Sequence, residues 1–209
     1  MKTIRFAVCG AGGRGTSLTT DVLSNLPDIE ICGIYDPYTD RAENLAGKIE
    51  EKKGKRPVVY GSTTELFDTE KPDAVLVSTS WESHVPVAVE ALEKGYAVAM
   101  EVGAVYSEQE CRDLVAAYEK TKAPFMLLEN CCFGKNELFA TAMVRDGRFG
   151  KIVYCHGAYR HDLRDEVTHG DVKRHYRLDE YMKRNPQLRS LRYSLLSRRQ
   201  RNRDRVRGR

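Results

Sequence analysis

The sequence of 209 residues contains no apolar run that approaches the roughly 18 residues needed to cross a bilayer. Its first residues pass directly into a short apolar run and lack the regions of a signal peptide. These two absences predict a cytoplasmic protein with no membrane partner. Hydrophobic residues make up 41% of the chain, which is compatible with a globular core.

The sequence also lacks the spacings that are typical of metal sites. None of its six cysteines forms a CxxC pair, and His156, His169 and His175 have no ligand-like spacing. We therefore predict no metal. Cys9 and Cys32 lie in apolar runs, where cysteine behaves as a small apolar residue, so reduced structural thiols are expected.

Lysine is absent from residues 184–209, which contain ten arginines and one acid, Asp204. This segment carries +9 while the whole chain carries +4, so residues 1–183 carry −5. An arm that binds nucleic acid is disfavoured, because Tyr193 is its only aromatic residue and nothing upstream supports it. The abrupt change in composition favours a segment outside the designed fold, from a shifted reading frame or a truncated gene product.

A glycine motif follows the first apolar run, Ile4–Cys9. Gly10 permits a sharp turn off a strand, Gly12 lets the backbone approach a pyrophosphate, and Gly15 lets a helix pack closely on the strand. Asp36 follows Gly15 by 21 residues, close to the spacing of about 20 for an acid that binds ribose hydroxyls. The pattern predicts a dinucleotide site, and a turn that serves only packing is the alternative.

The residues around this motif refine the predicted cofactor. Gly13 and Arg14 complete the turn, and Arg14 is placed to add a phosphate contact. Free N–H groups at the start of the next helix favour a pyrophosphate. The carboxylate of Asp36 repels a 2′-phosphate, so NAD is favoured over NADP. An N-cap for the helix that starts near Tyr38 is a second role for Asp36, and both roles are compatible.

Strand-like and helix-like runs alternate through residues 1–128. The strand-like runs are residues 3–9, 29–35, 57–60, 73–78, 96–100 and 125–128, and the helix-like runs are residues 14–25, 39–53, 63–70, 84–94 and 107–121. Continuous apolar strands such as residues 74–77 suit a parallel sheet that is covered on both faces. We therefore predict an α/β fold in which residues 1–128 form a doubly wound Rossmann domain.

The pattern changes after residue 128. Residues 134–145 predict a helix, and residues 152–160 predict a strand that opens a second domain. We expect residues 129–183 to be the incomplete beginning of an α+β domain that binds the substrate. A partial sheet leaves unpaired edges and an apolar face exposed, so we expect poor solubility or a homo-oligomer formed through the second-domain sheet.

These motifs resemble those of the Gfo/Idh/MocA family, which includes glucose-fructose oxidoreductase and inositol dehydrogenase. The resemblance covers about residues 3–183 and rests on residues 10–15, 36–38, 78–84, 101 and 148–152. It implies an NAD(P)-dependent oxidoreductase that acts on a sugar or cyclitol hydroxyl. Family members are normally longer, and they usually follow the fifth strand with Glu-Lys-Pro. Here the segment is Met100-Glu101-Val102-Gly103, so an ordinary dehydrogenase of this kind would need another base.

Residues 101–102, 128–133 and 157–164 look like those of a branch that lacks the lysine, the NAD-dependent α-N-acetylgalactosaminidases. In that branch a tightly held NAD takes a hydride from C3 of the sugar, and the resulting ketone acidifies the C2 proton. A base removes this proton, the aglycone leaves C1, water adds, and the hydride returns. The branch's Tyr-Pro-Thr-His segment is missing, because this chain has Asn-Pro-Gln-Leu at residues 185–188.

The resemblance also implies site residues. Those expected beside the cofactor are Ser80, Trp81, His84, Glu101 and Asn130. His84 lines the nicotinamide site or caps a helix that it opens, Trp81 stacks on the cofactor or covers the sheet edge, and Glu101 contacts the cofactor or serves as a helix N-terminal acid. The candidate catalytic residues are Glu129, Tyr159 and His161. His161 forms an acid/base pair with Asp162 or an ordinary pair in solvent.

Three functions are compatible with these residues. The first is an NAD-dependent oxidoreductase, the second is the redox-neutral glycosidase, and the third is a truncated nucleotide-binding fragment without turnover. A small-molecule sugar or glycoside is the expected partner of an active enzyme. NADH accumulates in the first case, whereas in the second the aglycone is released without it.

Overall fold

The computed structural model describes residues 3–103, 105 and 107–158. The chain forms two compact units, Met1–Asp146 and Gly147–Arg209. The first unit contains a six-stranded parallel sheet with the strand order β3-β2-β1-β4-β5-β6. Its strands are β1 (Ile4–Cys9), β2 (Ile29–Tyr35), β3 (Val58–Tyr60), β4 (Ala74–Val77), β5 (Ala97–Met100) and β6 (Phe125–Leu127). The prediction of a doubly wound parallel sheet is confirmed.

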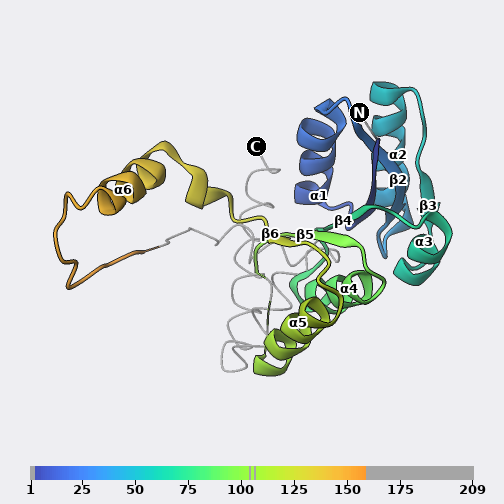
Figure 1. Ribbon diagram of the computed structural model, residues 1–209. Helices are drawn as coiled ribbons and strands as arrows, with labels where there is room; N and C mark the ends of the chain where they lie inside the picture. Colours follow the sequence, from blue (N-terminus) through green and yellow to red (C-terminus); the bar gives the residue numbers. More distant parts are fainter. Residues whose placement is uncertain (1–2, 104, 106, 159–209) are drawn as a thin grey trace, which may run out of the picture. The chain divides into compact units, whose positions relative to one another are not determined.

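Helices cover both faces of this sheet (Figure 1). They are α1 (Gly13–Ser17), α2 (Thr39–Lys53), α3 (Thr63–Glu70), α4 (Trp81–Glu93) and α5 (Glu108–Thr121), and α6 (Lys135–Arg145) follows the sheet in the chain. The helical segment that begins with α1 packs with α2 on one face, and α3, α4 and α5 pack on the other. No helix of the described residues is long and apolar enough to span a bilayer.

The central strands alternate their side chains between two apolar cores. In β1, Ala7 and Cys9 belong to the core under α3, α4 and α5, whereas Val8 belongs to the core under α2. All three side chains are fully buried. Because both faces of the sheet are covered, these strands appear in the sequence as continuous apolar runs, as expected for a parallel sheet.

The last residues of all six strands lie in one row. Cys9 at the end of β1 pairs with Tyr35 of β2 and with Val77 of β4, and the row continues through Met100 to Leu127. The strand order reverses between β1 and β4, and open α/β sheets bind ligands outside the carboxyl ends of the strands at such a point. A ligand is therefore expected at this edge of the sheet, beside the ends of β1 and β4.

The helix expected at residues 14–25 is helical throughout, but it is not one α-helix. After α1, Leu18–Val22 form a π-helical turn and Leu23–Asn25 form a 3₁₀ turn. The hydroxyls of Thr19 and Thr20 donate to the carbonyls of Gly15 and Thr16, at 2.7 and 3.0 Å. Such bonds compete with the backbone ladder and bend helices, which explains the departure from regular α geometry.

The expected strand at residues 152–160 is wrong for its described part. Residues 152–158 form no strand, and Val153 and Tyr154 are 88% and 77% exposed. A strand needs a neighbour to pair its backbone groups, and no described segment pairs with this one. The expected helix at residues 134–145 is confirmed as α6, whose residues are all at least partly exposed.

Candidate functional site

The glycine turn is closed by the end of β4. Gly10 has φ +101°, and a Cβ on it would lie 2.4 Å from the carbonyl oxygen of Ser78. A Cβ on Gly15 would lie 2.0 Å from the carbonyl oxygen of Gly10. Only glycine fits these two contacts, as the sequence predicted. The hydroxyl of Ser78 donates to the Gly10 carbonyl at 2.9 Å, a positioning role that we did not predict.

The middle of the turn is open. A Cβ on Gly12 or Gly13 would meet no atom within 4 Å. Gly12 precedes α1, and no side chain caps this end of the helix. The turn therefore offers free N–H groups and space on the same side, which is the arrangement that binds a pyrophosphate. On this observation the residues present fit a dinucleotide.

Asp36 holds the turn in place from the end of β2. Its side chain is buried, and its two oxygens accept hydrogen bonds from the backbone N–H groups of Ala11 and Tyr38, at 2.7 and 2.8 Å. The alternative role as helix N-cap is wrong, because Tyr38 is the N-cap and α2 begins at Thr39. Each carboxylate oxygen keeps a free lone pair that can accept a ribose hydroxyl.

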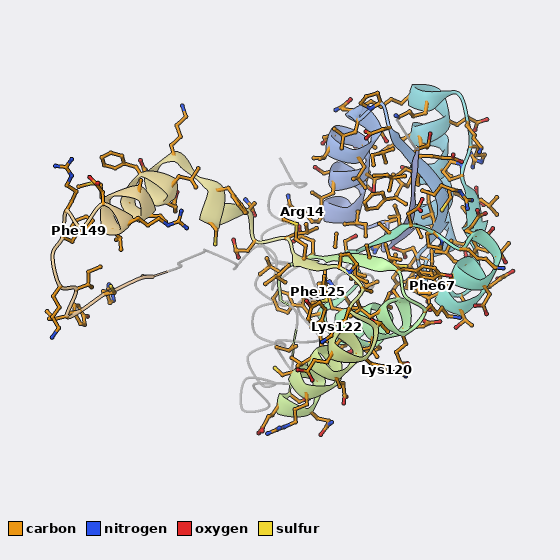
Figure 2. The ribbon with its side chains drawn as sticks, in the orientation of Figure 1. Arg14, Phe67, Lys120, Lys122, Phe125 and Phe149 are labelled. Atoms are coloured by element: carbon orange, nitrogen blue, oxygen red, sulfur yellow. The ribbon has the colours of Figure 1, made fainter. Side chains whose placement is uncertain are left out.

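Arg14 and Glu101 form an ion pair with each other. The guanidinium Nε of Arg14 lies 2.8 Å from Oε1 of Glu101, the residue that follows β5. Figure 2 shows Arg14 at the end of α1 that lies toward β5 and β6. The second oxygen of Glu101 accepts a hydrogen bond from the N–H of Val102 at 3.2 Å. We expected both residues beside the cofactor but did not predict that they form an ion pair.

His84 does not open a helix, contrary to expectation. Helix α4 begins three residues earlier at Trp81, because Ser80 is the N-cap and its carbonyl accepts from the N–H of Ser83 at 2.9 Å. His84 is 1% exposed, and neither ring nitrogen makes a hydrogen bond of normal geometry. Burial lowers the pKa of His84, against the opposing effects of the Thr79 backbone and the Glu101 carboxylate.

Ser80 and Trp81 lie between the glycine turn and the segment after β5. The hydroxyl of Ser80 lies 3.2 Å from that of Ser83. The indole of Trp81 packs against Gly103, where a Cβ would lie 2.3 Å from the indole Nε1. Trp81 thus lies against the chain that leaves β5.

Glu129 and Asn130 follow β6 at the same edge of the sheet. Oε1 of Glu129 accepts a hydrogen bond from the N–H of Cys131 at 2.9 Å and so caps the 3₁₀ turn Asn130–Phe133. Asn130 is exposed. Tyr159 and His161, the other candidate catalytic residues, lie outside the described residues. Among residues 3–103, 105 and 107–158, no group of three histidine, cysteine or acidic side chains is arranged to hold a metal.

Residues 4–128 match the family described as "Oxidoreductase family, NAD-binding Rossmann fold", which is Gfo/Idh/MocA. The chain belongs to this family. The predicted fold, the family resemblance and the nicotinamide dinucleotide cofactor are thereby confirmed at the level of the Gfo/Idh/MocA family. Residues 133–204 match a second description, "Glycosyl hydrolase 109, C-terminal domain", and this match includes most of the arginine-rich segment.

Individual relatives agree with both matches. The chain is 33% identical over 192 residues to a glycosyl hydrolase family 109 protein of Solibacter usitatus, covering 89% of this chain and 44% of that protein. It is 31% identical over 176 residues to an α-N-acetylgalactosaminidase of Shewanella oneidensis, covering 81% and 38%. The myo-inositol 2-dehydrogenase of Lactobacillus plantarum has the same fold, with a TM-score of 0.64 and 17% identity over 73% of this chain and 44% of that one. The chain thus spans less than half the length of the curated relatives it matches.

Proposed function

We propose that this chain supplies the cofactor-binding part of an enzyme that uses NAD to oxidise or reduce a hydroxyl-bearing carbon of a sugar or cyclitol. The observation that carries the proposal is the open glycine turn, where Gly12 and Gly13 leave room above an uncapped helix start. Bound NAD would supply the acceptor or donor of a hydride. The residues of the chain bind the dinucleotide, orient it and hold protons near the reacting carbon.

The positions of the side chains along the sheet edge suggest a role for each. Asp36 at the end of β2 would accept the ribose hydroxyls and exclude a 2′-phosphate, which favours NAD over NADP. Arg14 would contact the pyrophosphate, as would the N–H groups of the glycine turn. Ser80, Trp81, His84, Glu101 and Asn130 would line the nicotinamide side. Glu129 would face the substrate, and the family resemblance adds Tyr159 and His161, which lie outside the described residues, as further candidate catalytic residues.

A second candidate is the redox-neutral, NAD-dependent glycosidase. Two specific observations favour it: residues 133–204 match the C-terminal domain of glycosyl hydrolase 109, and Val102 stands directly after Glu101, where the family usually has a lysine. Without that lysine a net dehydrogenase must find another group to move the hydroxyl proton. In the glycosidase the hydride returns to the sugar, so that NAD is regenerated in each turnover.

NAD binding tests the proposal most directly. The Gly12→Ala substitution places a methyl group where the pyrophosphate would lie, but it touches no atom of the protein. We expect calorimetry to show NAD binding by the unchanged chain and at least about a ten-fold loss of affinity in Gly12→Ala, the result of losing one charge-assisted contact or more. Gly47→Ala, in α2 and away from the turn, is the matched control and should bind normally. Equal affinity in all three proteins would contradict the proposed site.

Turnover distinguishes the two candidate functions. Sugars, cyclitols and nitrophenyl glycosides would be offered to the chain with NAD, while NADH absorbance and nitrophenol release are followed together. A dehydrogenase accumulates NADH in proportion to the substrate consumed. A redox-neutral glycosidase releases nitrophenol with no steady rise in NADH, and that result would replace the first candidate by the second.

A further inference from the structure

The Arg14–Glu101 ion pair crosses the point where the strand order reverses. Arg14 stands in the first turn after β1, and Glu101 follows β5. In the sheet, β4 lies between β1 and β5. The 2.8 Å contact therefore bridges the end of β4, over which a dinucleotide must pass from its adenosine half to its nicotinamide half.

The two partners differ in their freedom to move. The side chain of Glu101 is only 14% exposed, and apart from Arg14 it accepts a hydrogen bond from its neighbour Val102. The side chain of Arg14 is 50% exposed. A largely shielded carboxylate needs a positive partner, whereas a half-exposed arginine can rotate away into solvent or onto another anion. Arg14 is thus the partner that can move.

A pyrophosphate competes with Glu101 for this arginine. It places oxygens with a larger negative charge at the glycine turn, and a guanidinium binds phosphate oxygens through two parallel hydrogen bonds. The exchange leaves the Glu101 carboxylate with the N–H of Val102, and the stronger attraction between Arg14 and the pyrophosphate must offset this loss. We propose that the Arg14–Glu101 pair is a latch across the dinucleotide site, which opens when Arg14 exchanges the Glu101 carboxylate for the pyrophosphate. This latch rests on the NAD-binding function proposed above.

The departure of Arg14 from Glu101 would also affect His84. His84 is buried in α4, its ring nitrogens make no hydrogen bond of normal geometry, and the Glu101 carboxylate raises its pKa against the larger opposing effect of burial. When Arg14 leaves, the charge of Glu101 is no longer balanced by the arginine and acts more strongly on His84.

The latch predicts effects of opposite sign at its two residues. ADP-ribose, which contains the pyrophosphate but no nicotinamide, is the probe, and calorimetry gives its affinity. Glu101→Gln removes the competing carboxylate, so ADP-ribose should bind about three-fold more tightly. Arg14→Gln removes the phosphate contact, so it should bind about ten-fold more weakly. In the double variant of Arg14 and Glu101, the two changes in ADP-ribose affinity should not add, because Glu101 acts on binding only through Arg14. Adenosine, which lacks the pyrophosphate, should bind to all variants with equal affinity.

Glu93 and Lys120 provide the matched control. They form an exposed ion pair of 3.2 Å between α4 and α5, and Glu93→Gln and Lys120→Gln should leave ADP-ribose affinity unchanged. Weaker or unchanged binding by Glu101→Gln would overturn the latch, since a carboxylate that contacts the cofactor directly predicts weaker binding. If the unchanged chain binds ADP-ribose but the latch variants behave like the controls, only the latch fails. If circular dichroism shows folded proteins and none binds ADP-ribose, the cofactor site and the latch both fail.

Discussion

His84 is the least ordinary residue of the site. Both of its ring nitrogens are buried without a hydrogen bond of normal geometry, and within the described residues the hydroxyl of Ser24 is the only other such side-chain group. Buried polar groups without partners are costly, so natural proteins retain few of them. A neutral imidazole carries one donor and one acceptor.

The same burial predicts a pH effect on stability. Because the folded state lowers the pKa of His84 below its ordinary 6.5, the unfolded chain takes up a proton first as the pH falls. The neutral, buried His84 therefore does not reduce the free energy of unfolding above pH 6.5. As the pH falls from 6.5 toward the lowered pKa of the folded state, the free energy of unfolding decreases progressively. We expect the free energy of unfolding to fall by up to about 1.4 kcal/mol per pH unit in this range. Urea unfolding at a series of pH values measures it.

His84→Gln and His156→Gln separate this effect from the titration of other groups. The glutamine at position 84 does not titrate, so the pH dependence should flatten in His84→Gln. His156 is exposed, and its substitution should leave the dependence as it was. Equal slopes in His84→Gln and the unchanged chain would show that another group is responsible.

Single residues of the site were predictable to different degrees. The spacing of Gly10, Gly15 and Asp36 along the chain follows a local motif. That spacing was sufficient to predict that these residues lie at the glycine turn. The Arg14–Glu101 pair joins residues 87 positions apart, and only the strand order brings them together. Ser78 was missed as a positioning residue for the same reason, since its contact to Gly10 depends on β4 lying beside β1.

At the scale of elements, helix α5 shows a complete capping box. The hydroxyl of Ser107 accepts from the N–H of Glu110 at 3.1 Å, and the Glu110 carboxylate accepts from the N–H of Ser107 at 3.2 Å. Two backbone donors that the helix leaves free are thus satisfied. This local signal explains why the predicted start of the helix was nearly correct.

Ser107→Ala should therefore destabilise the chain. Loss of an N-cap acceptor costs about 1 kcal/mol, and the urea midpoint should fall accordingly. Ser107→Asp keeps an acceptor at the cap and should retain most of the stability. If the two variants lose equal stability, the cap is not the cause.

Elements with local signals were predicted well, and those that depend on distant partners were not. The expected boundaries of α2 and α3 were correct, because apolar residues recur at helical spacing on one side of each. The π-helical turn at Leu18–Val22 was missed, since it arises from threonine hydroxyls competing for backbone carbonyls. The wrong strand at residues 152–160 had an apolar pattern but no described strand to pair with.

At the scale of the whole molecule, some candidate residues lie in the described part of the chain and others lie outside it. The glycine turn, Asp36 and Glu101 lie in the first compact unit, Met1–Asp146. Tyr159 and His161 belong to the second unit and lie outside the described residues. Cofactor binding can thus be tested on contacts within one unit. The division of the domains at residue 128 stays a prediction.

Exposed apolar side chains predict the behaviour of the molecule in solution. Phe139 in α6 is 67% exposed, and Val153 in the second unit is 88% exposed. Each lies in a segment with other exposed apolar residues, and such surfaces favour association.

Light scattering during size exclusion should show a mass that rises with concentration. Phe139→Ser with Val153→Ser should lower that mass, while Val22→Ser, at an exposed apolar residue near α1, should not. A concentration-independent monomer would contradict the expected association through the second-domain part of the chain.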